Sequence, residues 1–139
     1  MKKNVLCIEG NKSICFLIET LLKSKYSVLS VGDNLLAMER INSGIEIDII
    51  IISIENAEDE NAELLYHLGS SSLLRNIPIV VLSNSKYDEL KSICLDSNVH
   101  AFFTKPFNPI ELAEKIDQTM LTDKQSQILH KKRKVFNLN

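Results

Sequence analysis

Five short apolar runs lie along the chain, and the segments between them carry apolar residues at helical spacing. The third run, residues 47–52, is isoleucine at every position except Asp48, and β-branched residues favour strands. Unbroken apolar runs are typical of strands that a parallel sheet buries on both faces. We therefore predict buried strands at Val5–Ile8, Val28–Val31, Ile47–Ile52, Ile79–Leu82 and Ala101–Thr104.

Helix signals fill the intervals between these runs. Asn11 and either Asp33 or Asn34 suit N-cap positions, because their side chains accept hydrogen bonds from the first helical turn. Asn108, which precedes a proline, is a further start signal. Gly69 and the three serines after it predict a loop. The apolar faces expected on the five helices carry Ile14, Leu17, Ile18, Leu21 and Leu22; Leu35, Met38 and Ile41; Leu64, Leu65 and Leu68; Leu90, Ile93 and Cys94; and Leu112, Ile116 and Met120.

The alternation of five strands with five helices predicts an α/β fold. Alternation of this kind implies a parallel sheet with helices on both faces, and we predict a doubly wound sheet with the flavodoxin-like strand order 2-1-3-4-5. The residues expected deepest in its core are Ile8, Ile50, Ile52, Val81 and Leu82.

A change of pattern marks the end of the expected domain. Residues 1–121 hold the alternating elements, and residues 122–139 are expected to form a basic C-terminal tail or helix extension. The basic run HKKRK at residues 130–134 favours a solvated terminal helix, with an acidic partner, a nucleic acid or a membrane surface as the alternative. The tail is too short for an output domain, so we expect a stand-alone module.

Composition narrows the class of protein further. The chain has 139 residues, of which 45% are hydrophobic, so a sizeable core is expected. A net charge of −2 argues against nucleic-acid binding by the domain as a whole. The apolar run at the N-terminus is too short for a signal peptide or a membrane span, so we expect a cytoplasmic protein. Three cysteines, Cys7, Cys15 and Cys94, are expected to be reduced.

Candidate chemistry gathers where the expected strands end. The third strand runs into Ser53, the fourth into Ser83, and the fifth is followed by Lys105 and Pro106. Open α/β sheets carry their functional sites at this carboxyl edge. This set of strand ends resembles the receiver domain of two-component response regulators, the CheY-like family, and the resemblance covers residues 3 to about 121.

The resemblance implies a role for each strand-end residue. Ser53 stands where the family has its phosphoacceptor aspartate, and Ser83 matches the hydroxyl that binds the phosphoryl group. Lys105 matches the family lysine, which precedes a proline usually in a cis peptide bond. Phe102 matches the switch aromatic. The resemblance therefore implies a receiver fold with an atypical acceptor.

The metal-binding position departs from the family as well. An acidic pair after the first strand holds Mg²⁺ in the family, and Glu9 and Gly10 match that pair here. The charges of Glu9 and Lys105 sum to zero, which does not favour a divalent cation. Glu55 follows Ser53 by two residues, but the family uses the backbone carbonyl at that position. We expect Mg²⁺ binding to be weak or absent and no other cofactor.

Serine without an adjacent base is a poor nucleophile, so we expect no phosphoryl transfer at Ser53. We favour inherited structure over an active site here: Lys105 forms a fixed ion pair with Glu9 and hydrogen-bonds both Ser53 and Ser83, which satisfies these groups without a ligand. Under this hypothesis, Glu9, Gly10, Ser53, Ser83 and Lys105 form a degenerate phosphorylation pocket.

Three functions remain to be weighed. The leading one is a pseudo-receiver that is not an enzyme and binds a histidine kinase or other signalling protein. The resemblance places that contact on the surface of the fourth helix, fifth strand and last helix, including Tyr87, Lys91, Phe102 and Phe103; a homodimer is left open. The second is a working phosphorelay receiver with an unorthodox acceptor. The third, a flavodoxin-like cofactor binder or enzyme, is disfavoured because the chain has four glycines and no glycine-rich loop.

Overall fold

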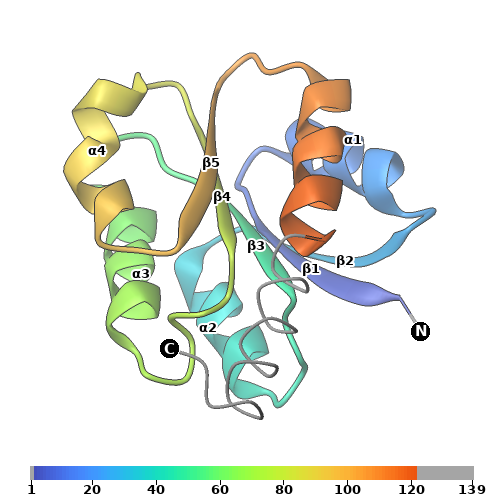
Figure 1. Cartoon of the computed structure of the whole chain (residues 1–139), viewed down its shortest axis with the longest axis horizontal. Helices are drawn as coiled ribbons and strands as arrows, with labels where there is room; N and C mark the ends of the chain where they lie inside the picture. Colours follow the sequence, from blue (N-terminus) through green and yellow to red (C-terminus); the bar gives the residue numbers. More distant parts are fainter. Residues whose placement is uncertain (1, 122–139) are drawn as a thin grey trace, which may run out of the picture.

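The computed structural model describes residues 2–121, and a sheet of five parallel strands forms its centre (Figure 1). The strand order is β2-β1-β3-β4-β5, and every neighbouring pair is parallel. This confirms the predicted flavodoxin-like topology. The strands are β1 (Lys3–Ile8), β2 (Tyr26–Val31), β3 (Ile49–Ser53), β4 (Ile79–Ser83) and β5 (Val99–Thr104).

Five helices connect or follow the strands, and side-chain caps mark where four of them begin, at Asn11, Asp33, Asp59 and Asn108. The side chain of Asn11 accepts a hydrogen bond from the N–H of Ile14, and the side chain of Asp33 accepts one from Leu36. Asn108 caps the last helix in the same way. The helices are α1 (Lys12–Leu22), α2 (Asn34–Asn42), α3 (Glu60–Ser70), α4 (Tyr87–Leu95) and a fifth helix over residues 109–121.

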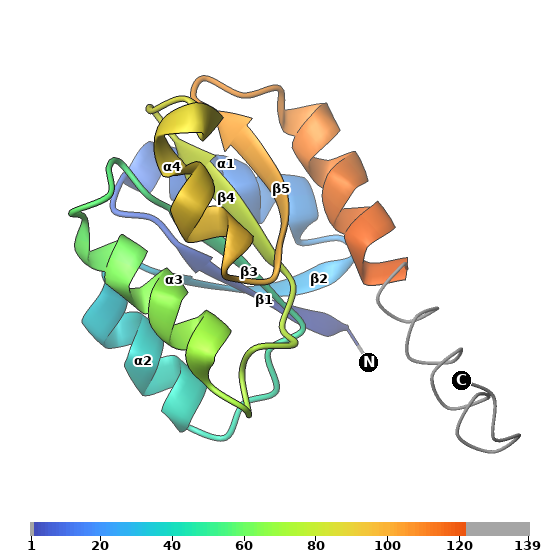
Figure 2. The same ribbon diagram turned by 60° about the vertical axis from the view of Figure 1, so that its left-hand side comes forward.

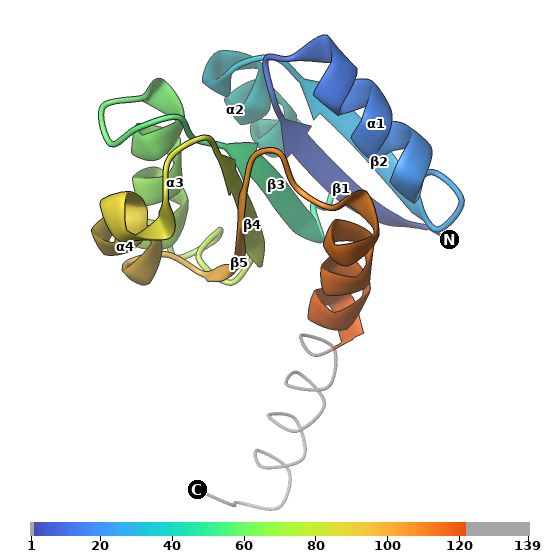
Figure 3. The ribbon, with the colours of Figure 1, turned by 90° about the horizontal axis from the view of Figure 1, so that it is seen from above.

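The helices form two layers, one on each face of the sheet. Helix α1 and the helix of residues 109–121 cover one face, and α2, α3 and α4 cover the other (Figures 2 and 3). Successive strand residues alternate between these layers. Ile8, Ile50, Ile52 and Val81 face α2–α4, whereas Leu82 faces α1 and the last helix. All five are fully buried, which confirms the predicted core.

Two apolar positions and one loop differ from the prediction. Leu35 is 77% exposed, because the buried stripe of α2 is set by Ala37, Met38 and Ile41 and Leu35 lies outside it. Leu17 is 38% exposed at the border of its stripe on α1. Helix α3 also continues through Gly69 and Ser70, where a loop was predicted.

The reason for the glycine within α3 is a close contact between chain segments. A Cβ atom on Gly69 would lie 2.7 Å from the backbone oxygen of Asp96 and 2.7 Å from Oγ of Ser97. Glycine therefore lets the end of α3 pack against the turn between α4 and β5. The Oγ of Ser97 donates a hydrogen bond to the carbonyl of Leu65 across the same contact.

The prediction placed the ends of several strands one or two residues away from their positions in the structure. Strands β1, β2 and β5 begin two residues earlier than predicted, because pairing with a neighbour extends beyond the apolar runs. Strand β3 begins two residues later, at Ile49, although Ile47 is still buried. The predicted tail, residues 122–139, lies outside the described residues.

Candidate functional site

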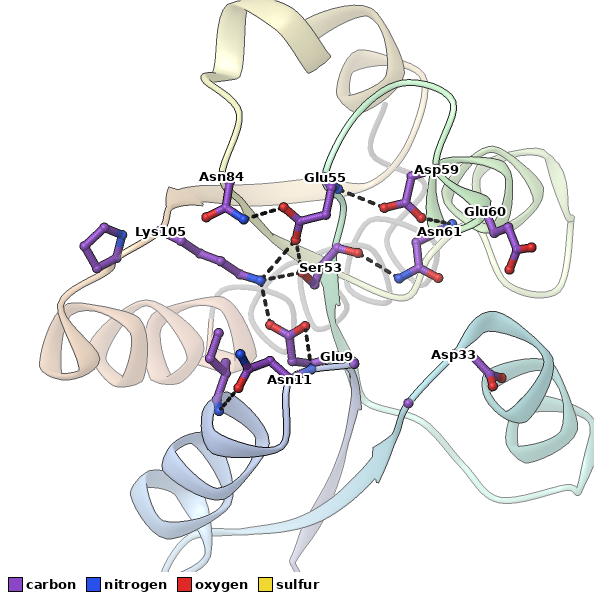
Figure 4. A pocket seen from close by; sticks show the side chains of 14 residues that line it. Glu9, Asn11, Asp33, Ser53, Glu55, Asp59, Glu60, Asn61, Asn84 and Lys105 are labelled. Carbon is purple, nitrogen blue, oxygen red and sulfur yellow. Dashed lines mark hydrogen bonds and ion pairs between the residues drawn. The ribbon is translucent and has the colours of Figure 1, made fainter.

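An open cleft of about 730 Å³ lies at the carboxyl ends of the strands. Side chains from the ends of β1 and β3, and from the segments after β4 and β5, line it (Figure 4). Lys105 is the single basic side chain among the residues described along this cleft. The acidic side chains along it are Glu9, Asp33, Glu55, Asp59 and Glu60.

The ammonium group of Lys105 is the centre of a buried polar network. Its Nζ lies 2.7 Å from Oε1 of Glu9, and it donates a hydrogen bond of 2.7 Å to Oγ of Ser53. A third contact, of 3.3 Å, reaches Oε1 of Glu55. The side chains of Lys105 and Glu9 are only 9% and 5% exposed, so the pair is almost fully withdrawn from water. A buried ion pair of this kind requires all its partners to remain in place.

The carboxylate of Glu55 is the second centre of the network. Its Oε1 accepts a hydrogen bond of 3.1 Å from the hydroxyl of Ser53, and its Oε2 accepts one of 2.5 Å from Nδ2 of Asn84. Together with Lys105, these donors come from the ends of three neighbouring strands, β3, β4 and β5. Figure 4 shows the three donor groups pointing toward this one carboxylate.

Backbone contacts hold Glu55 in this position. Its N–H donates to Oδ2 of Asp59 at 2.9 Å, and its carbonyl accepts a hydrogen bond of 2.6 Å from Oγ of Ser85. Asp59 also caps α3, and Asn61 in that first turn donates to the carbonyl of Ser53 at 2.7 Å. Hydrogen bonds therefore join both the end of β3 and the loop after it to the start of α3.

These contacts change the acidity of Glu55. Burial acts to raise the pKa of its carboxyl group, but the hydrogen bond from Asn84 and the positive charge of Lys105 outweigh burial. The pKa of Glu55 therefore lies below its ordinary value, and the group is ionised at neutral pH.

Some of the residues predicted from the sequence meet here and others do not. Lys105 contacts both Glu9 and Ser53, and Gly10 lines the cleft. Ser83 is buried, but its hydroxyl accepts a hydrogen bond from the N–H of Ser85 at 3.0 Å. The predicted contact between Lys105 and Ser83 was wrong, because Lys105 turns toward the carboxylates instead.

Sequence reasoning missed the side chains of Glu55 and Asn84. The position of Glu55 was predicted to contribute only its backbone carbonyl. The expected charge of the site was therefore the sum of Glu9 and Lys105, which is zero. In the structure the carboxylate of Glu55 enters the site, and its backbone carbonyl is bonded to Ser85. The sequence offered only one signal for these two residues, which is their position. Glu55 follows the end of β3, Asn84 follows the end of β4, and these two strands are paired.

The aromatic residue Phe102 lies beyond the cleft, on β5. Its side chain is partly buried against the core on the side of α2–α4. The ring of Tyr87, at the start of α4, meets it edge to face, with centroids 5.4 Å apart and an interplanar angle of 75°.

The peptide bond between Lys105 and Pro106 is cis, as the resemblance implied.

The family model for the response regulator receiver domain matches residues 5–117, which include all of the sheet except the first two residues of β1 and all the residues described along the cleft. The chain belongs to the response regulator receiver family. Its receiver fold is therefore that of a signalling module. In the described part of this receiver domain, no helix is both long and apolar enough to cross a membrane.

Named relatives agree with this assignment. The receiver domain is 31% identical over 93 residues to the two-component response regulator ORR7 of Oryza sativa subsp. japonica, a match that covers 67% of this chain and 44% of that protein. It is 27% identical over 128 residues to hybrid signal transduction histidine kinase D of Dictyostelium discoideum, covering 92% of this chain and 8% of that protein. The chain thus corresponds to less than half the length of these two relatives.

Solved structures show the same receiver fold. The phosphorylated cyanobacterial phytochrome response regulator RcpA matches with a TM-score of 0.69 and 25% identity, over 82% of this chain and 88% of that one. A CheY-like receiver domain protein from Methanospirillum hungatei JF-1 matches with a TM-score of 0.79 and 19% identity, over 91% of this chain and 99% of that one.

Proposed function

We propose that this receiver domain works in two-component signalling as a pseudo-receiver: it binds a protein partner and does not accept a phosphoryl group at Ser53. The observation that carries the proposal is the state of the Ser53 hydroxyl. It lies at the phosphoacceptor position, it is 4% exposed, and it is held between Lys105 and Glu55. A hydroxyl bound on both sides to charged neighbours is poorly placed to attack an incoming phosphoryl group.

The donor set around Ser53 also fits a Mg²⁺ ion poorly. Glu9 is bonded to the Lys105 ammonium, Gly10 has no side chain to offer, and the carbonyl of Glu55 is bonded to the hydroxyl of Ser85. Within residues 2–121, no group of three or more metal-ligating side chains is arranged around a common point. Mg²⁺ demands near-octahedral oxygen ligands, so these residues support a site without the metal.

We propose that the partner binds away from the cleft, on the surface of α4, β5 and the last helix. Tyr87 is 38% exposed on α4, and Lys91 is exposed one turn later. Phe102 and Phe103 of β5 pack into opposite core clusters, so this strand links the surface to both layers. We propose a histidine kinase or another signalling protein as the partner, with a second copy of the chain as the alternative occupant.

Incubation with acetyl phosphate and Mg²⁺, followed by intact mass measurement, tests the loss of phosphoacceptance. We expect no added phosphoryl group on the wild-type protein. We expect the same for Ser53→Asp alone, because the carboxylate missing at Gly10 is not restored. The double variant with Gly10→Asp should be modified more readily. A Cβ atom at Gly10 would have the oxygen of Gly32 as its nearest neighbour, at an ordinary contact distance of 3.5 Å.

One observation favours the second candidate, a receiver with an unorthodox acceptor. The Glu55 carboxylate accepts the hydrogen bond of the Ser53 hydroxyl, which is the geometry of a base beside a nucleophile. The lowered pKa of Glu55 makes it a weak base, which favours the pseudo-receiver. A phosphoryl group mapped to Ser53 in the wild-type protein would establish the second candidate and overturn the first.

A further inference from the structure

The arrangement around Glu55 is that of an anion and its receptor. Three donor groups from three strand ends converge on one carboxylate: the Ser53 hydroxyl and the Lys105 ammonium on Oε1, and the Asn84 amide on Oε2. Charge-assisted hydrogen bonds of this kind are the strong ones in proteins. The donors come from the sheet, whereas the anion comes from the loop after β3.

The anion is presented by a backbone that is itself fixed. The N–H and the carbonyl of Glu55 are bonded to Asp59 and Ser85 respectively. The carboxylate is therefore held beside the donors by its own backbone. Its effective concentration at the site is higher than that of a free anion in solution. Its side chain is still 42% exposed, so the site faces the solvent of the cleft.

We propose that Ser53, Asn84 and Lys105 form a binding site for a small oxyanion, and that the carboxylate of Glu55 is its resident ligand. The inference rests on the proposed function, since a phosphoryl group on Ser53 would need the space that this carboxylate fills. Removal of the carboxylate should open the site to a free anion of the same charge and shape. The chemical class that fits is a singly charged carboxylate such as acetate.

Charge explains why a monoanion is the matching ligand. The ion pair between Lys105 and Glu9, at 2.7 Å, does not involve Glu55, so a site without the Glu55 carboxylate is expected to offer no large positive excess. Asp33, Asp59 and Glu60 also line the cleft. A single negative charge restores the native balance, whereas a multiply charged anion adds repulsion from these carboxylates.

The same contacts link the cleft to the proposed partner surface. Asn84 and Ser85 both bond to Glu55, and they lie directly before α4, which begins at Tyr87. Tyr87 in turn contacts Phe102 on β5. The resident carboxylate, through Asn84, and the backbone carbonyl of Glu55, through Ser85, thus hold the connection between β4 and α4 without an external ligand.

Acetate titration of Glu55→Ala, followed by NMR of the Asn84 side-chain amide, tests the proposal. We expect a saturable shift of that resonance across the millimolar range, toward its wild-type position, and a rise in the unfolding temperature that saturates with it. Wild type should show at most a linear drift. Glu58→Ala is the matched control, because it removes an equal charge from an exposed side chain of the same loop. Sodium chloride at equal ionic strength controls for screening.

Three further variants decide the interpretation. Glu55→Gln keeps the volume of the side chain, so it should not bind acetate. Glu55→Ser also vacates the site and should bind acetate, so it covers the case in which Glu55→Ala does not fold. Asn84→Ala combined with Glu55→Ala should lose the saturable shift, here read from Lys105. An absence of saturation in Glu55→Ala, or equal binding by Glu55→Gln or Glu58→Ala, would overturn the proposal. No phosphodonor is used, so this result is separate from the phosphorylation test.

Discussion

Two charged clusters join the first half of the chain to its last segments, one at each edge of the sheet. At the carboxyl edge, Lys105 pairs with Glu9, and their side chains are 9% and 5% exposed. At the amino edge, Asp117 of the last helix pairs with Lys25 at 2.9 Å and accepts a hydrogen bond from the hydroxyl of Tyr26. There the side chains of Lys25 and Asp117 are 66% and 39% exposed.

The difference in burial teaches what each cluster contributes. A buried charge that loses its partner remains out of water, so removal of one member is costly. An exposed charge regains water when its partner is removed, so the pair contributes little. The carboxyl-edge cluster should therefore fix the structure of the cleft, and the amino-edge cluster should act mainly through the Tyr26 hydrogen bond.

The largest effect is expected for Lys105→Met. The substitution leaves Glu9 buried without its partner and removes a donor from Ser53 and Glu55. We expect the free energy of unfolding to fall by about 3–5 kcal/mol, measured by urea denaturation. Lys25→Met is the matched control and should change it by less than about 0.5 kcal/mol. Equal losses for the two variants would break the comparison between the clusters.

Glu9→Gln should have a smaller effect than Lys105→Met. Glutamine at position 9 is neutral, and Lys105 keeps its contact with Glu55. The substitution therefore leaves no charged side chain of the cluster without a partner. We expect a loss of about 1–3 kcal/mol, from the weakened hydrogen bond to a buried ammonium. Urea denaturation with the wild type in parallel measures it. A loss as large as that of Lys105→Met would mean that Glu55 does not compensate.

Tyr26→Phe tests the amino edge. The hydroxyl of Tyr26 donates to Asp117, and the substitution removes only this bond. We expect a loss of about 1 kcal/mol in the free energy of unfolding. The loss should persist in high salt, whereas any contribution of Lys25 is screened. A Tyr26→Phe variant as stable as the wild type would leave the amino edge without a stabilising contact.

The smallest effect is a dependence on acid pH shared by both clusters. Burial acts to raise the pKa of Asp117, but the hydrogen bonds from Tyr26 and Lys25 outweigh it, so this pKa is lowered, like that of Glu55. A lowered folded pKa gives stability that is present above the unfolded value, about 4, and is lost as pH falls through the folded value. Stability against pH should therefore flatten below about pH 4 in Asp117→Asn and in Glu55→Gln. Both carboxylates are partly exposed, so we expect modest changes; unchanged acid slopes in both variants would contradict the lowered pKa values.

The sequence predicted the sheet, its order and the positions of three of the four side-chain caps. Runs of apolar residues report burial directly, and Asn11, Asp33 and Asn108 carry side chains that act within their own helix turn. Errors arose where a distant segment decides the local structure. Gly69 was expected to end a helix, but the approach of the segment at Asp96 is what requires glycine there.

Only part of the candidate site could be predicted from the sequence. Glu9, Ser53 and Lys105 end or follow strands, and strand ends of a parallel sheet meet at one edge, so their proximity follows from topology. Contacts made from loops do not follow from topology. The direction of the Glu55 side chain depends on the bonds of its backbone to Asp59 and Ser85, which no local pattern encodes.

The sequence by itself thus determined the family and the layered fold, because these depend on residue type and on periodicity along the chain. Tertiary structure alone decided that Glu55 occupies the donors at the cleft and that Tyr26 bonds to Asp117, 91 residues away. Such pairs form only after the sheet has brought remote segments together. Their geometry is set by side-chain rotamers and loop backbone within the packed molecule.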